Sequence, residues 1–118
     1  MKVGDYVRTK SYGIKKINGF SSTLEEDFID CDYDKYQKVL INKKEVIKSS
    51  PNIIDLIEVG DYVNGKKVID TFTDYIFDYS EEFKAIRFSE TDILHNVKHI
   101  KSIVTKEQFE SMEYKVGE

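Results

Sequence analysis

The sequence predicts a mainly β fold, built from two small modules in tandem with one short helix near the C-terminus. The first observation is an internal repeat: Val3–Val7 (Val-Gly-Asp-Tyr-Val) returns as Val59–Val63, and Ile47–Ser49 returns in the same order as Ile100–Ser102. The second is composition, because alanine occurs once while Ile, Val, Tyr and Phe, which favour strands, are abundant. The third is a series of short apolar runs separated by turn residues, a pattern typical of small β modules.

Length and composition limit the architecture. Of the 118 residues, 40% are hydrophobic and 13% aromatic, which is enough to form a core. A module of about 55 residues is near the lower limit for an independent core, so we expect residues 1–50 and 51–118 to pack as one cooperative unit. The single cysteine, Cys31, excludes an internal disulfide. We find no signal peptide, transmembrane run or lipidation motif, and therefore expect a cytoplasmic protein.

Alternation and turn signals place the elements of the first module. The predicted strands cover 3–9, 14–17, 28–33, 38–41 and 45–48, with a loop at 18–23 and a turn at 42–44. Within the third strand, Ile29, Cys31 and Tyr33 are expected on one face and three aspartates on the other. Ser50 and Pro51 indicate a short helical turn at the junction of the modules.

The second module has a tighter first hairpin. Asn64-Gly65 predicts a two-residue turn, and the first module has about five more residues there, so that Ile17 aligns with Val68. Further strands are predicted at 72–79, 84–88 and 99–104, and a helical turn at 92–97.

The strongest helix signal is Lys106–Met112. Thr105 is its expected N-cap, Gln108 completes a capping box, and Val104 with Phe109 forms a hydrophobic staple. Residues 115–118 echo the N-terminal residues 2–5 and predict a short additional strand.

Charge patterning favours a basic partner. The net charge is −4; residues 1–50 carry 10 basic and 8 acidic groups, whereas residues 51–118 carry 8 and 14. An acidic chain is poorly suited to general DNA or RNA binding, which requires neutralisation of phosphates. It is better suited to a basic protein surface, including one that normally holds nucleic acid.

A run of carboxylates is the principal candidate site. Asp30, Asp32 and Asp34 would form a ladder with a spacing of about 7 Å on one strand face, which could imitate a phosphate backbone and occupy a groove of Arg and Lys. The alternative is a solvated face that protects a sheet edge. The predicted protein-binding set is Glu25, Glu26, Asp27, Asp30, Asp32, Tyr33, Asp34 and Tyr36, with Asp74, Tyr75, Asp78 and Tyr79 from the second module.

Metal and catalytic chemistry are not expected. A calcium loop that begins at Asp30 would need glycine and glutamate where Lys35 and Ile41 stand. His95 and His99 share the spacing of a helix face, but zinc needs three or four ligands. No phosphate-binding glycine loop, serine nucleophile elbow or zinc-protease motif occurs, so we predict a non-enzymatic protein without a cofactor.

Two resemblances extend these predictions. The Val-Gly-Asp-Tyr-Val opening and its return strand resemble small Src-homology-3-like barrels of the KOW and Tudor kind, which implies two such barrel or sheet modules. The segments 51–65 and 100–114 resemble small uncharacterised proteins of phages and prophages of clostridia and related Firmicutes. This second resemblance implies a phage accessory protein that acts in the host cytosol.

Three functional hypotheses follow. The first is an anti-CRISPR-like inhibitor that binds a host defence protein, such as a nuclease, through the acidic and aromatic surface. The second is a sponge for a nucleotide second messenger, in which Arg8, Lys66, Lys67 and Arg87 are available for phosphates. The third is a nucleic-acid-associated barrel with exposed tyrosines as stacking platforms. The repeats could pack within one chain or between the two chains of a homodimer.

Overall fold

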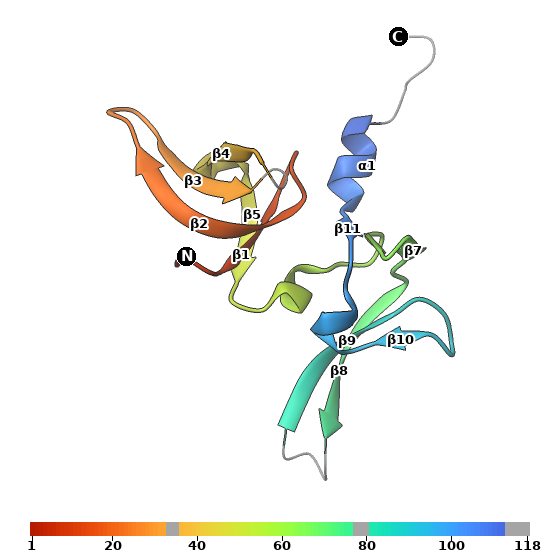
Figure 1. Ribbon diagram of the computed structural model, residues 1–118. Coiled ribbons are helices and arrows are strands. Elements are labelled where there is room, and N and C mark those ends of the chain that lie inside the picture. The colour runs from red at the N-terminus through yellow and green to blue at the C-terminus, as the bar shows by residue number, and fades with distance from the viewer. Residues whose placement is uncertain (33–35, 77–80, 113–118) are drawn as a thin grey trace, which may run out of the picture. The chain divides into compact units, whose positions relative to one another are not determined.

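The computed structural model describes residues 1–32, 36–76 and 81–112. The chain divides into two compact units, Met1–Leu56 and Ile57–Glu118, here called the first and second modules. Their described parts contain three small antiparallel sheets and a single α-helix, which confirms the predicted mainly β class (Figure 1). The structure places the division after Leu56, because the 3₁₀ helix η2 (Ile53–Leu56) belongs to the first module.

The first module is one five-stranded antiparallel sheet of order β4-β3-β2-β1-β5. Its strands are β1 (Tyr6–Thr9), β2 (Ile14–Ser22), β3 (Asp27–Asp32), β4 (Lys38–Asn42) and β5 (Val46–Ser50). The first strand lies between the second and the last, so the chain returns to its own beginning. The predicted turn at 42–44 is the 3₁₀ helix η1 (Lys43–Glu45), whose N-cap Asn42 accepts a hydrogen bond from the Lys44 N–H.

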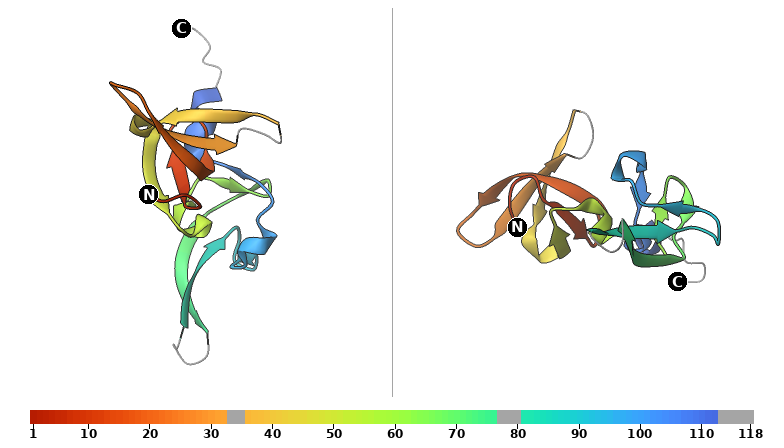
Figure 2. Two further views of the ribbon diagram at one scale, coloured as in Figure 1. Left: turned by 60° about the vertical axis from the view of Figure 1, so that its left-hand side comes forward. Right: turned by 90° about the horizontal axis from the view of Figure 1, so that it is seen from below.

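The predicted loop at 18–23 is wrong, because β2 continues through Ser22. The pairing register slips between Ile17 and Gly19, and this irregularity bends the strand. The first half of β2 therefore pairs with β1 and the second half with β3. The bent β2, drawn in red to orange, is visible in both further views of the ribbon (Figure 2).

The core of the first module is made by alternate residues of its strands. Ile29 and Cys31 are both fully buried, which confirms the predicted inward face of β3. They belong to a buried cluster that also contains Val7, Ile17 and Ile41. Tyr12, from the loop between β1 and β2, packs against this cluster.

The second module contains two three-stranded antiparallel sheets, β10-β9-β8 and β11-β6-β7. The strands are β6 (Tyr62–Val63), β7 (Lys66–Lys67), β8 (Asp70–Ile76), β9 (Glu81–Arg87), β10 (Ile93–Leu94) and β11 (Ile103–Val104). The β8–β9 hairpin extends beyond the rest of this module in Figures 1 and 2. Val63, Val68 and Ile86 are fully buried.

The backbone of the second module repeats that of the first. The Gly4 N–H donates to the Ile17 carbonyl at 2.9 Å, and the Gly60 N–H donates to the Val68 carbonyl at 2.9 Å. Both glycines have positive φ, +94° and +97°, a conformation that is costly for other residues. Tyr6 pairs with Lys16 and Tyr62 with Lys67, so the five-residue difference in the hairpin is as predicted.

The second half of this module differs from its prediction. The helical turn expected at 92–97 is wrong, because Ile93 and Leu94 form strand β10. The helical turn lies later, as η3 (Val97–His99), and its N-cap Asn96 accepts from the Lys98 N–H as Asn42 does from Lys44. Of the strand predicted at 99–104, only Ile103–Val104 is strand.

Helix α1 (Lys106–Met112) has the predicted bounds. Its capping box is present: the Thr105 N–H donates to Gln108 Oε1 at 2.9 Å, and the Gln108 N–H donates to Thr105 Oγ1 at 3.3 Å. Phe109 packs on Tyr62, with ring centroids 4.7 Å apart. The strand predicted at 115–118 lies outside the described residues.

Candidate functional site

The outer face of the first module's sheet carries the predicted acidic ladder. Asp30 is half-buried and Asp32 is exposed, on the face opposite Ile29 and Cys31. Asp30 accepts a hydrogen bond from Ser21 Oγ at 3.3 Å. A Cβ at Gly19 would lie 3.1 Å from Asp30 Oδ2, so a glycine opposite Asp30 leaves room for its carboxylate.

The other end of the ladder has a different environment. Asp32 stands opposite Lys38 in the β3–β4 register, which places a cation beside it on the neighbouring strand. The predicted members Tyr33 and Asp34 lie outside the described residues. Tyr36 follows them and is 86% exposed.

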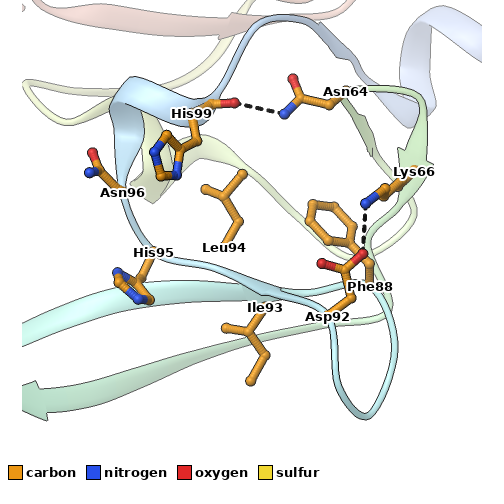
Figure 3. A pocket seen from close by; sticks show the side chains of 9 residues that line it. All are labelled: Asn64, Lys66, Phe88, Asp92, Ile93, Leu94, His95, Asn96 and His99. Atoms are coloured by element: carbon orange, nitrogen blue, oxygen red, sulfur yellow. Dashed lines mark hydrogen bonds and ion pairs between the residues drawn. The ribbon is translucent and has the colours of Figure 1, made fainter.

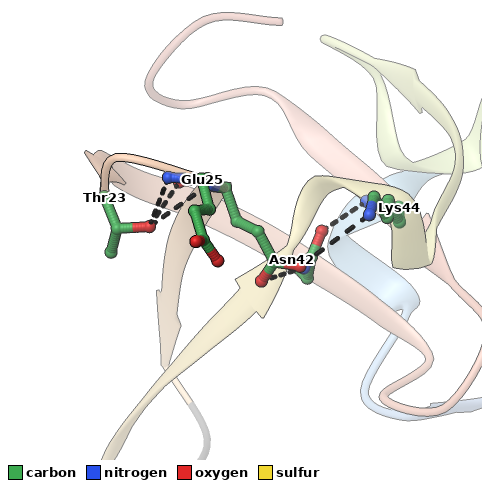
Figure 4. A network of polar contacts seen from close by, with 5 residues as sticks. Thr23, Glu25, Asn42 and Lys44 are labelled. Atoms are coloured by element: carbon green, nitrogen blue, oxygen red, sulfur yellow. Dashed lines mark hydrogen bonds and ion pairs between the residues drawn. The ribbon is translucent and has the colours of Figure 1, made fainter.

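Of the three acidic residues before the ladder, Glu25 and Glu26 lie in the β2–β3 hairpin turn and Asp27 begins β3. Thr23 Oγ1 accepts from the backbone N–H groups of Glu25 and Glu26 and fixes the turn (Figure 4). Glu26 Oε2 accepts from Asn42 Nδ2 at 2.9 Å, and Glu26 Oε1 lies 3.8 Å from Lys44 Nζ. Glu26 therefore holds the turn against the end of β4, whereas the side chains of Glu25 and Asp27 are exposed.

Apolar side chains lie among these carboxylates. Leu24 at the hairpin turn is fully exposed, and Leu40, opposite Asp30 on β4, is 57% exposed. Sequence reasoning missed both, although Leu40 is an apolar residue at an outward position of an alternating strand. We give the name acidic–apolar face to the outward residues of β3 and β4 together with the exposed residues of the adjoining loops: Leu24, Glu25, Asp30, Asp32, Tyr36 and Leu40.

The remaining predicted residues belong to the second module. Asp74 is exposed on β8, opposite Phe83 of β9. Tyr75 occupies the next position of β8, and Asp78 and Tyr79 lie outside the described residues. The predicted set is thus divided between the two modules.

A hollow of about 360 Å³ lies in the second module. Asn64 bridges its rim: Nδ2 donates to the His99 carbonyl at 2.7 Å, and Oδ1 accepts from the Lys101 N–H at 2.7 Å. Lys66 Nζ lies 2.8 Å from Asp92 Oδ2 and 5.7 Å from the centre of the Phe88 ring. The lining includes Asn64, Lys66, Phe88, Leu94, His95 and His99 (Figure 3).

The basic residues considered for phosphate binding do not converge on this hollow. Arg8 is fully buried and donates from Nη1 to the Leu56 carbonyl at 2.8 Å. Arg87 donates to the Glu90 carbonyl at 3.2 Å, and its guanidinium lies 5.0 Å from the centre of the Phe72 ring. Of the four cations in that hypothesis, Lys66 alone is among the described lining residues.

The titratable groups offer no cluster for a metal ion in the part of the chain that the structure describes. No group of three or more His, Cys, Asp or Glu residues is close enough there to hold a metal ion. Burial raises the pKa of the Cys31 thiol, which Lys15 partly offsets, so this cysteine stays protonated at neutral pH. A protonated, buried thiol is a poor nucleophile.

Comparisons with protein-family models, curated proteins and solved structures gave no match to this chain. Within the described residues, every helix is too short or too polar to cross a membrane.

Proposed function

We propose that this chain is a non-enzymatic binding protein whose first module binds a protein with a basic surface. The observation that carries the proposal is the acidic–apolar face, where exposed Leu40 stands opposite Asp30, with Asp32 two positions along β3. Exposed Leu24 lies in the hairpin turn that precedes β3. Solvated acidic faces are common, but this one also presents large apolar side chains that would be better buried.

The two kinds of side chain would contribute differently to binding. Burial of Leu24, Leu40 and Tyr36 would supply affinity by removing apolar area from water. The carboxylates would steer a basic partner into place and exclude acidic ones. Association should therefore become slower as ionic strength increases, since exposed charges are screened within about 10 Å at 0.1 M salt.

The resemblance to phage accessory proteins suggests the biological role. We propose inhibition of a host defence protein, such as a nuclease, in the bacterial cytosol. A carboxylate-rich face would occupy the Arg- and Lys-lined groove that otherwise receives nucleic acid. Such competition requires no catalytic residue in the inhibitor.

The second-messenger alternative has less support from the geometry. It needs several cations at one concave site, and Lys66, which lines the hollow, is already in an ion pair with Asp92. The nucleic-acid alternative is opposed by the net charge of −4.

Native mass spectrometry of the protein purified from a bacterial host with active defence systems tests the proposal. A co-purifying host protein that is lost in the Asp30→Lys/Asp32→Lys variant would support it. The matched control is Glu90→Lys/Glu110→Lys, which makes the same charge change at exposed positions of the second module. Equal capture by both variants would refute the site, and a bound mass of a few hundred daltons would favour the second-messenger alternative.

A further inference from the structure

The two modules differ at one place where their backbones otherwise correspond. In the first module, nine residues separate the paired residues Tyr6 and Lys16; in the second, four separate Tyr62 and Lys67. The additional residues of the first hairpin include Tyr12, which packs against the buried cluster. The second module has only the Asn64-Gly65 turn at this position.

The hollow lies where the second module lacks a counterpart of Tyr12. The hydrogen bonds from Gly4 and Gly60 equate Ile17 with Val68. From there the strand registers equate Ile29 with Ile86 and Ile41 with Leu94. Ile41 belongs to the buried cluster that Tyr12 packs against, and Leu94 lines the hollow.

The rim supports the same correspondence. In the first module, the Lys10 N–H donates to the carbonyl of Glu45, the last residue of η1. In the second, the Asn64 side chain donates to the carbonyl of His99, the last residue of η3. A side-chain amide thus ties the short hairpin to the 3₁₀ helix where the longer hairpin uses its backbone, and Asn64 and His99 both line the hollow.

We propose that this hollow binds a tyrosine-like ring, a phenol, from outside the module. Leu94 and Phe88 supply an apolar floor and an aromatic neighbour, as Figure 3 shows. His95 and His99, both exposed at the rim, supply hydrogen-bonding groups for the hydroxyl. The volume of about 360 Å³ exceeds the roughly 150 Å³ that a benzene ring requires.

The ligand could be a free phenolic molecule or a tyrosine side chain within a polypeptide, and the chemistry of the hollow is the same for both. The inference does not depend on the acidic–apolar face, because every residue that carries it belongs to the second module or to the comparison with Tyr12.

The first test is an ¹⁵N–¹H NMR titration of the whole chain with p-cresol, the isolated tyrosine side chain. We expect saturable shifts at the amides of Gly65, Leu94 and Asn96, with a dissociation constant on the order of 1 mM. The control probe is 4-methylcyclohexanol, which has similar size without an aromatic ring and should bind at least about threefold more weakly. Absence of saturable shifts, or shifts equal for the two probes, would overturn the proposal.

Two variants test the geometry. His99→Ala removes a rim imidazole but retains the backbone carbonyl that Asn64 uses, so it should weaken p-cresol binding severalfold while the Lys101 amide resonance stays near its position. Tyr12→Ala should create a second p-cresol site, reported by shifts at Ile17 and Ile41; Tyr12→Leu replaces it if the alanine variant does not fold. If His99→Ala leaves the affinity unchanged, the ring does not occupy this hollow.

The source of the ring is decided by a parallel titration with the peptide Gly-Gly-Tyr-Gly, with Gly-Gly-Leu-Gly as control. Tighter binding of the tyrosine peptide than of p-cresol would identify a polypeptide ligand. Binding of p-cresol alone would identify a free phenol. Failure of both would refute the proposal.

Discussion

The aspartate of the repeated Val-Gly-Asp-Tyr-Val motif makes different contacts in its two copies. Asp5 Oδ2 accepts from the Lys2 N–H at 3.0 Å, in an exposed position. Asp61 Oδ2 accepts from the Glu58 N–H at 2.8 Å, and its Oδ1 also accepts from the N–H of Lys106, the first residue of α1, at 3.0 Å. Asp61 is fully buried. Its hydrogen bond with Lys106 connects the motif to the C-terminal helix.

Replacement of Asp61 by alanine should be much more costly than the same change at Asp5. A hydrogen bond to a charged group contributes roughly 1.5–3 kcal/mol, and Asp61 makes at least two from a buried position. Water can reach part of the Lys106 backbone after the substitution, so we expect a loss of about 3 kcal/mol for Asp61→Ala. The single exposed bond of Asp5 predicts about 1 kcal/mol for Asp5→Ala.

Urea unfolding gives the overall free energies, and native-state hydrogen exchange locates the losses. The Val68 and Ile17 amides are matched probes, because they donate to the backbone carbonyls of Asp61 and Asp5 respectively. Asp61→Ala should raise exchange at Val68, and Asp61→Asn, which keeps one acceptor oxygen, should have an intermediate effect. An Asp5→Ala variant as destabilised as Asp61→Ala would refute the reasoning.

Further substitutions test the repeated geometry. Gly4→Ala and Gly60→Ala should each lower the free energy of unfolding by about 1 kcal/mol, because φ is +94° and +97°; urea midpoints that do not move would contradict this. Asn42→Ala removes both the cap of η1 and a bond to Glu26 and should cost about 1.5 kcal/mol in thermal unfolding. Asn96→Ala, which removes only the equivalent cap as far as the described contacts extend, should cost less.

The buried thiol makes a prediction about pH. Burial raises the pKa of Cys31 above its ordinary value of 9.0, so the folded protein holds the proton more tightly than the unfolded chain. The corresponding stability is fully present below the unfolded pKa and is lost as the pH rises through the folded pKa. Cys31→Ala should flatten the alkaline part of the urea-midpoint profile. Iodoacetamide should label the unfolded chain quickly at pH 8 and the native protein slowly; equal rates would contradict the burial.

The sequence was sufficient where local signals and packing agree. The repeated motif, the hairpin of unequal length and the bounds of α1 were predicted, since glycine positions, the Asn64-Gly65 turn and the capping box are local. The alternation of Ile29 and Cys31 with aspartates was also enough to orient β3. The hydrogen bond from Asn42 to Glu26 was not predicted, because it joins residues 16 positions apart in the sequence.

Other features depend on pairing across the sheet. Asn18 and Gly19 were predicted to lie in a loop, but both belong to β2. Gly19 pairs with Asp30 of β3, and the register slip between Ile17 and Gly19 accommodates Asn18 within the strand. Ile93 and Leu94 were assigned to a helical turn, yet pairing with Arg87 and Ile86 makes them a strand. The repeated Ile-Lys-Ser sequence equates Ser49 with Ser102, but the strand pairing does not. Ser49 lies opposite Val7, whereas Ile103, one residue after Ser102, lies opposite the equivalent residue Val63.

That displacement shows which part of the repeat the fold maintains. The residues that pair with β1 and β6 are not those that the repeated Ile-Lys-Ser sequence equates. The N-caps agree with the pairing instead, because Asn42 precedes Ser49 by as many residues as Asn96 precedes Ile103. Backbone pairing and caps are therefore common to both modules, while side chains at equivalent places differ. Tyr12 packs against the core of one module from a hairpin that the other module shortens to a two-residue turn, and the hollow is in the module with the short turn. A difference of a few hairpin residues therefore accompanies the hollow that we propose as a binding site.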